Sequence, residues 1–284
     1  MTEQLDKISD QIMQEFASGK LVIPSLPEVI HRIQQAVSDK KRGTQQIAKL
    51  IQLDPALTAR LIQIANSSAY RGAFPIETCQ MAVTRLGLRT TRNLVTCLVM
   101  HNVFDTSKKS VHKRIRELWK HSCRVAAIAY VIAQINKGLL DPDKALLAGL
   151  VHDIGVIPIF YYLADYPELF EQNEFVDELI SKLRGKLGHA ILSTWQFEQE
   201  LLQVPEEAEN WHYSQGERLN YVDVVIVAQL HSLFGTDPQN GLPKLTELKS
   251  FEKMSLSRLG PEAGIELLHA ADGEIREMVQ MLLG

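Results

Sequence analysis

Four histidines and one aspartate in the second half of the chain have residue types that can hold a metal ion. They are His121, the adjacent pair His152 and Asp153, His189 and His212. Imidazole and carboxylate groups both bind divalent transition metals, and both are costly to bury without a partner. His152 and Asp153 lie inside an apolar run flanked by two glycines, which allow the backbone to approach a neighbouring helix closely.

A metal centre built from these residues would have a defined chemistry. Imidazoles together with a carboxylate favour zinc, iron or manganese over calcium. Such an ion lowers the pKa of a bound water to about 7 and polarises a phosphoryl oxygen, as a phosphohydrolase requires. Spacing alone leaves a second interpretation open, because Asp153 could simply accept a hydrogen bond from His152 or His121. The other histidines show no relation to these five residues: His31, His101, His112, His231 and His269.

The segments around the candidate ligands have helical periodicity. Apolar residues recur at steps of three and four from about 111 to 136, which predicts a long helix with His121 on its apolar face. A short loop leads to a second helix that begins at Asp141-Pro142 and runs into His152, so the two helices should be antiparallel neighbours. Further helices are predicted near 156–163, 179–197 and 221–234. Helices packed side by side can bring such ligands together in a bundle core.

The first half of the chain is predicted to be a layer of shorter helices. Asp54 and Pro55 are good residues for an N-cap and a first helical position, and we find no period-two strand. The sequence therefore predicts an all-α fold. Polar residues 105–110 mark an internal boundary, which divides the chain into three parts: an N-terminal helical subdomain at 1–110, a helical core at 111–235 and a C-terminal helical extension at 236–284.

Composition restricts the functional classes. The 284 residues are 45% hydrophobic and carry a formal net charge of -4, which argues against nucleic acid as the main partner. The N-terminus lacks the features of a signal peptide, and we count no apolar run of about 18 residues, so no membrane span is expected. Cys97 and Cys123 lie in helical apolar patterns and, with Cys79, are expected to be reduced, which favours a cytoplasmic location.

The order of the candidate ligands resembles the HD phosphohydrolase superfamily. The surrounding sequence resembles its HDOD family, the HD-related output domains of bacterial signalling. The likeness covers roughly residues 20–235 and rests on these motifs: Ile23–Val29, Asp54–Leu61, Ala65–Tyr70, Ala82–Gly87, Trp119–Ser122 and Leu147–Gly155.

The resemblance implies an HD-type helical bundle with an N-terminal helical layer that begins at about residue 20. It also implies one divalent transition metal ion (iron, manganese or zinc) held by His121, His152, Asp153, His189 and His212. HDOD proteins act in bacterial signal transduction, often beside receiver or cyclic-di-GMP domains. Residues 236–284 are too few for such a domain, so we expect a stand-alone output module that receives its input from a partner signalling protein.

One departure from the HD pattern bears on catalysis. HD enzymes complete their site with an aspartate after an alanine on the last core helix, whereas this chain has Ala228-Gln229. Asp223 lies six residues earlier, on a different helix face. Trp211-His212 also stands where many relatives have two histidines.

These departures favour a non-catalytic module that acts through protein–protein interaction. The alternative is a metal-dependent phosphohydrolase or phosphodiesterase of the HD superfamily. Nucleotide or nucleic-acid binding has only the scattered Arg85, Arg89 and Arg92 in its support.

Overall fold

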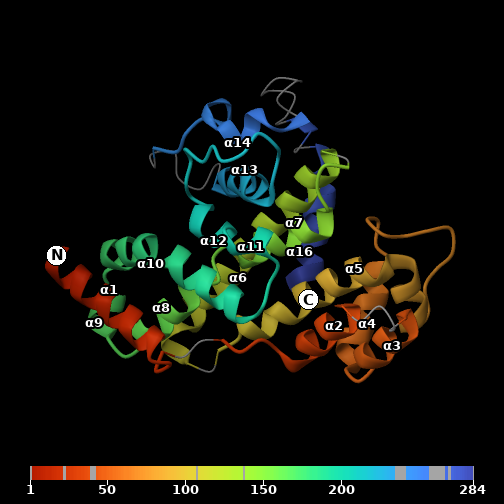
Figure 1. Ribbon diagram of the computed structural model, residues 1–284, viewed down its shortest axis with the longest axis horizontal. Helices are drawn as coiled ribbons and strands as arrows, with labels where there is room; N and C mark the ends of the chain where they lie inside the picture. The colour runs from red at the N-terminus through yellow and green to blue at the C-terminus, as the bar shows by residue number, and fades with distance from the viewer. Residues whose placement is uncertain are drawn as a thin grey trace.

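The computed structural model describes residues 2–21, 24–38, 43–106, 108–136, 138–233, 241–255, 266–267 and 270–283. Every regular element within these ranges is a helix, which confirms the predicted all-α fold (Figure 1). In the first half the helices are α1 (Thr2–Ala17), α2 (Glu28–Ser38), α3 (Thr44–Ile51), α4 (Pro55–Ala65), α5 (Cys79–Met100) and the 3-10 turn η1 (His101–Val103).

The second half contains the longer central helices. They are α6 (Lys109–Ile135), α7 (Pro142–Val151), α8 (Val156–Leu163), α9 (Pro167–Phe170), α10 (Asn173–Thr194), α11 (Gln199–Leu202), α12 (Val204–Glu207) and α13 (Tyr221–Leu233). The chain then adds η2 (Leu245–Glu247), α14 (Lys249–Glu252) and α16 (Asp272–Leu283).

Local sequence explains several helix boundaries. The Asp54 side chain accepts a hydrogen bond from the Leu57 amide at 3.0 Å, and Pro55 follows at the first helical position. Asp141 caps α7 in the same way, accepting from the Asp143 amide at 3.0 Å. Gly87 has φ 78° inside the run that forms α5 and therefore kinks the helix there, a conformation that only glycine adopts readily.

The antiparallel pair α6 and α7 forms the centre of the fold, as the short connecting loop predicts. Helix α13 packs on both members of this pair, and α5 of the N-terminal layer packs on α7. A Cβ added at Gly149 would lie only 2.6 Å from the Ala126 Cα, so α6 and α7 approach each other with no side chain between them at that point.

The two ends of the described chain pack on the core. Helix α1 contacts α10, where Asp6 pairs with Lys182, and it lies away from α2–α4 in Figure 1. Helix α16 packs on α6, and the Arg60 guanidinium of α4 donates to the Met281 carbonyl at 2.9 Å. The predicted boundary at 110 falls beside the first residue of α6, while the one at 235 lies outside the described residues.

One apolar stretch in the structure is longer than any apolar run that we counted in the sequence. Residues Pro142–Leu163, which span α7 and α8, are long and apolar enough to cross a membrane by length and composition alone. Of their most apolar window, 94% is buried inside the protein, as in a core helix. All three cysteines are buried and free.

We predict that Gly149→Ala destabilises the fold by about 3 kcal/mol, because the new Cβ would overlap the α6 backbone and overpacking costs about 1–3 kcal/mol. Urea denaturation measures the change. Gly273→Ala in the first turn of α16 is the matched control, since its Cβ would meet no heavy atom within 4 Å. Equal stability of the two variants would contradict the close helix contact.

Candidate metal centre

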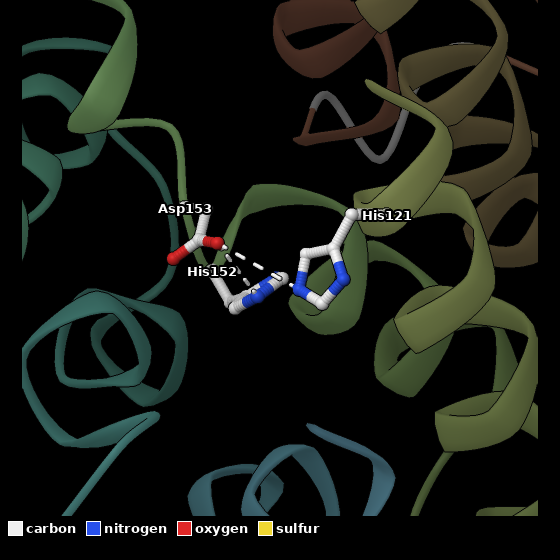
Figure 2. A group of neighbouring side chains, drawn as sticks. All are labelled: His121, His152 and Asp153. Carbon is white, nitrogen blue, oxygen red and sulfur yellow. Dashed lines mark ion pairs between the residues drawn. The ribbon is translucent and has the colours of Figure 1, made fainter. Parts of the chain in front are cut away.

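Three of the five predicted ligands converge where α6 meets the end of α7. His121 comes from α6, His152 is the residue that ends α7, and Asp153 begins the turn to α8. One ligand atom from each lies within 4.8 Å of the others. Figure 2 shows both imidazoles directed towards Asp153, whose Oδ2 lies 3.2 Å from His152 Nε2 and 3.8 Å from His121 Nε2.

Close backbone packing fixes the turn that carries this cluster. A Cβ at Gly155 would lie 2.0 Å from the Arg184 carbonyl oxygen and 2.5 Å from the Gly188 nitrogen. Only glycine permits so close an approach of the turn to α10. The contact therefore places the middle of α10 beside Asp153.

His152 is fully buried, and its hydrogen bonding defines its tautomer. Its Nδ1 lies 2.7 Å from the Gly149 carbonyl oxygen, which can only accept, so Nδ1 carries a hydrogen. Nε2 has no hydrogen-bond partner among the described residues, although it faces Asp153 Oδ2. Two lone pairs facing each other at this distance repel. Either a proton on Nε2 or a shared cation makes the contact favourable.

Asp153 is neutralised from its other side by Arg184 of α10. Arg184 Nη1 donates to Asp153 Oδ1 at 2.8 Å, and Nη2 lies 3.0 Å from Glu209 Oε2. Burial by itself would raise the pKa of the Asp153 carboxyl. The neighbouring His152, followed by the charge of Arg184, outweighs burial and holds the pKa of Asp153 well below its ordinary value. Asp153 is thus an ionised carboxylate with one oxygen already occupied.

His121 also has a protein partner at the atom that faces the cluster. Its Nε2 donates to the Gln229 side-chain oxygen of α13 at 2.9 Å. Burial, followed by the electrostatic effect of the neighbouring His152, lowers the pKa of His121 to about 4. The ring is therefore neutral at physiological pH, the form that a metal ligand requires.

His189 and His212 lie outside this cluster. His189 Nδ1 is 3.1 Å from Glu206 Oε2 of α12, and His212 is exposed in the turn after α12. Five residues separate His189 from Arg184, which at about 100° per residue places them on different faces of α10. Their assignment as metal ligands stays a prediction. Asp223 points elsewhere, as its register predicts, and Lys253 and Ser250 donate to its Oδ1 at 2.9 Å.

Sequence reasoning missed Arg184, although a signal was present. Arg184 directly follows Leu183 and precedes Leu187 by three residues, within the buried face of α10. A charge on an apolar helix face needs a partner. The sequence does not identify that partner, which lies 31 residues away at Asp153.

The residues present fit a metal ion in part. His152 donates its Nδ1 hydrogen to a carbonyl and turns Nε2 towards a carboxylate; a metal-bound histidine is commonly oriented by such a hydrogen bond from its other ring nitrogen. Asp153 Oδ2 would be a second ligand. His121 would join them only by giving up its bond to Gln229. An ion held there would supply Lewis acidity and an activated water.

Comparison with known proteins identifies the family of this chain. A family model described as the HDOD domain matches residues 23–211, which is more than half of the chain. This chain belongs to the HDOD family.

Three relatives of the HDOD chain are informative. A crystal structure from Shewanella amazonensis, provisionally described as a metal-dependent phosphohydrolase, is 28% identical with a TM-score of 0.81 and covers 98% of this chain and 99% of that one. A Marinobacter aquaeolei structure, provisionally described as a signal transduction protein, is 21% identical with a TM-score of 0.63, over 94% of this chain and 61% of that one, and shows the fold alone. An uncharacterized Treponema pallidum protein is 24% identical over 241 residues, 78% of this chain but 45% of its own length. The HDOD chain thus spans less than half of that relative.

We predict that Arg184→Met destabilises the HDOD fold by about 3–5 kcal/mol, because it leaves the buried Asp153 carboxylate without its guanidinium. Chemical denaturation at neutral pH gives the value. Arg32→Met is the control, since the exposed pair of Arg32 with Glu28 should contribute less than about 1 kcal/mol. A similar loss in both variants would contradict the structural importance of Arg184.

The lowered pKa of His121 predicts a pH dependence of stability. Between pH 6.5 and about 4 the unfolded chain binds a proton that folded His121 does not, so stability is complete above pH 6.5 and falls as the pH falls. The contribution is about 3 kcal/mol at most. Denaturation with a chelator present should show wild type losing stability relative to His121→Gln over this range. A stability difference between wild type and His121→Gln that stays constant over this pH range would contradict the prediction.

Proposed function

We propose that this HDOD protein is a non-catalytic signal-transduction module that acts by binding a partner protein. The observation that carries the proposal is the occupation of two ligand atoms by the protein itself. Arg184 holds Asp153 Oδ1, and Gln229 holds His121 Nε2. Catalytic metal sites of the zinc type keep three protein ligands and an open position for water. Here only His152 Nε2 and Asp153 Oδ2 remain directed at a common point.

Charge supports the same proposal. Arg184 has a side chain that is 6% exposed and places a fixed positive charge 2.8 Å from the only carboxylate of the cluster. A divalent cation at that carboxylate would be repelled by the guanidinium in a poorly screened environment. Glu209 lies 3.0 Å from the other guanidinium nitrogen, so Arg184 is held in place by two carboxylates.

A metal-dependent phosphohydrolase is the second candidate. It is supported by the orientation of His152 Nε2 and by the provisional description of the Shewanella relative. In that case His121, His152 and Asp153 would hold the ion, which is iron, manganese or zinc by ligand type. His189 and His212 would then have to move towards the cluster to take part.

Hydrolysis of a generic phosphodiester with added manganese tests the proposal. We expect the wild-type rate to equal that of Asp153→Ala, which lacks the only carboxylate of the cluster. A manganese-dependent rate that disappears in Asp153→Ala would overturn the non-catalytic function and favour the phosphohydrolase.

Calorimetric titration with manganese gives an independent measurement. Gln229→Asp places a carboxylate, on a side chain one methylene shorter, at the position whose amide now binds His121, and we expect it to raise the manganese affinity at least about tenfold, or about 1.4 kcal/mol. Asn93→Asp is the control, because it also replaces a buried amide by a carboxylate but does so outside the cluster. Wild type that already binds as tightly as Gln229→Asp would contradict the role given to Gln229.

A further inference from the structure

A polar cavity lies where the N-terminal layer meets the core, apart from the candidate metal centre. It has a volume of about 590 Å³, within the range of small-molecule sites. Helices α2 and α5 form one wall, while α7 and the turn between α10 and α11 form the other. We call it the seam cavity, and its lining includes Arg92, Asn93, Lys144, Gln196, Phe197 and Glu198.

Two cations from opposite walls converge on one carboxylate in the seam cavity. Arg92 of α5 lies 2.7 Å from Glu198 Oε1, and Lys144 of α7 binds the other oxygen of Glu198. Glu198 is the only acidic residue among the described residues that line the cavity. Lys144 also pairs with Glu200 at 2.6 Å, on the side of a neighbouring cavity. The protein thus places an oxyanion of its own between a guanidinium and an ammonium group.

The side chains of these three residues differ in exposure. Lys144 and Arg92 are 11% and 22% exposed, whereas Glu198 is 45% exposed. Glu198 can therefore turn into solvent at a lower cost than either cation can leave the cavity. An exposed carboxylate between two better buried cations is the component that a ligand can replace.

A buried donor without an acceptor adds to the site. Asn93 lines the cavity, is 1% exposed, and its Oδ1 accepts from Arg92 at 3.3 Å. Its Nδ2 has no hydrogen-bond partner within the described parts of the chain. An unsatisfied buried donor costs about 1–3 kcal/mol. A ligand oxygen beside Arg92 is the kind of acceptor that would satisfy it.

The remaining lining has room for an organic group. Leu147, Phe197 and Leu201 provide apolar surface beside the two cations. Gln196 has φ 57°, a left-handed conformation that is uncommon outside glycine, and it sits in the short turn that carries Phe197 and Glu198. This turn therefore presents an aromatic ring and an exchangeable carboxylate to the same cavity.

We propose that the seam cavity binds a small phosphate monoester, whose phosphate takes the place of the Glu198 carboxylate between Arg92 and Lys144. A guanidinium binds phosphate through parallel hydrogen bonds, and an ammonium group adds a point charge. The organic part packs on Phe197 and the neighbouring leucines. Because the two cations belong to different layers, the ligand links the N-terminal layer to the core. The site is independent of any metal at His152 and Asp153.

Isothermal titration of the full chain with adenosine monophosphate tests this proposal, with inorganic phosphate and adenosine as the two partial probes. We expect adenosine monophosphate to bind more tightly than phosphate and adenosine not to bind. Arg92→Gln should weaken binding at least about tenfold, as expected for loss of a hydrogen bond to a charged group. Glu198→Gln should strengthen binding several-fold, because a neutral amide competes less well for the two cations.

Arg89→Gln is the matched control. Arg89 is one helical turn from Arg92 in α5 but pairs with Asp141 at 2.9 Å outside the seam cavity, so the affinity should not change. Circular dichroism establishes that each variant is folded. Absence of binding by both phosphate probes, equal affinities of Glu198→Gln and wild type, or retained binding in Arg92→Gln would each overturn the proposal. Loss of binding in Asp153→Ala would assign the phosphate to the metal centre and overturn it as well.

Discussion

The ionised carboxylate of Asp153, buried at the end of α7, is the constraint on which the surrounding structure depends. A buried charge of this kind is tolerated only with close partners. Arg184 supplies a guanidinium at 2.8 Å, and the main chain of α10 approaches the turn so closely that position 155 admits only glycine. The direct contact of α6 with α7 at Gly149 then fixes His121 and His152 on the remaining side. Close helix packing and the ion pair with Arg184 thus both determine the position of the Asp153 side chain.

This arrangement shows how protein groups alone can contact a cluster of metal-ligand residues. A metal and a guanidinium both neutralise a carboxylate, but the guanidinium is covalently attached and satisfies its partner permanently. Once Arg184 holds one oxygen of Asp153, stability no longer requires an ion at the other. His152 keeps an orientation suited to a metal because Gly149 fixes its Nδ1, which is a matter of local backbone geometry. Retained ligand residues are therefore weak evidence for catalysis in this chain.

Local features of the sequence predicted more of the structure than long-range ones. The helices, the Asp54 and Asp141 caps and the interruption at Gly87 depend on neighbouring residues, and all are present in the structure. The meeting of His121 with His152 followed from helical periodicity and a short loop. Arg184 could not be paired with Asp153 in this way, since nothing local specifies contacts between helices that are 31 residues apart. The packing of α1 on α10 could not be predicted either, because the apolar face of an amphipathic helix does not show which surface it will pack against.

The interface between the N-terminal layer and the core differs in kind from the centre of the fold. Helices α6 and α7 approach closely at Gly149, whereas the contact of the N-terminal layer with α7 includes several polar groups. Tyr70 and Thr90 both donate to the carboxylate of Asp143, and Arg92 and Lys144 share Glu198. Burial raises the pKa of Asp143, while its two hydroxyl partners oppose that shift, so these bonds offset the cost of burying the acid. Polar contacts can exchange partners without opening a cavity, which tightly packed side chains cannot do. The proposed signalling function needs one interface that can change while the core stays intact, and the polar contacts at Asp143 and Glu198 have the physical character that such a change requires.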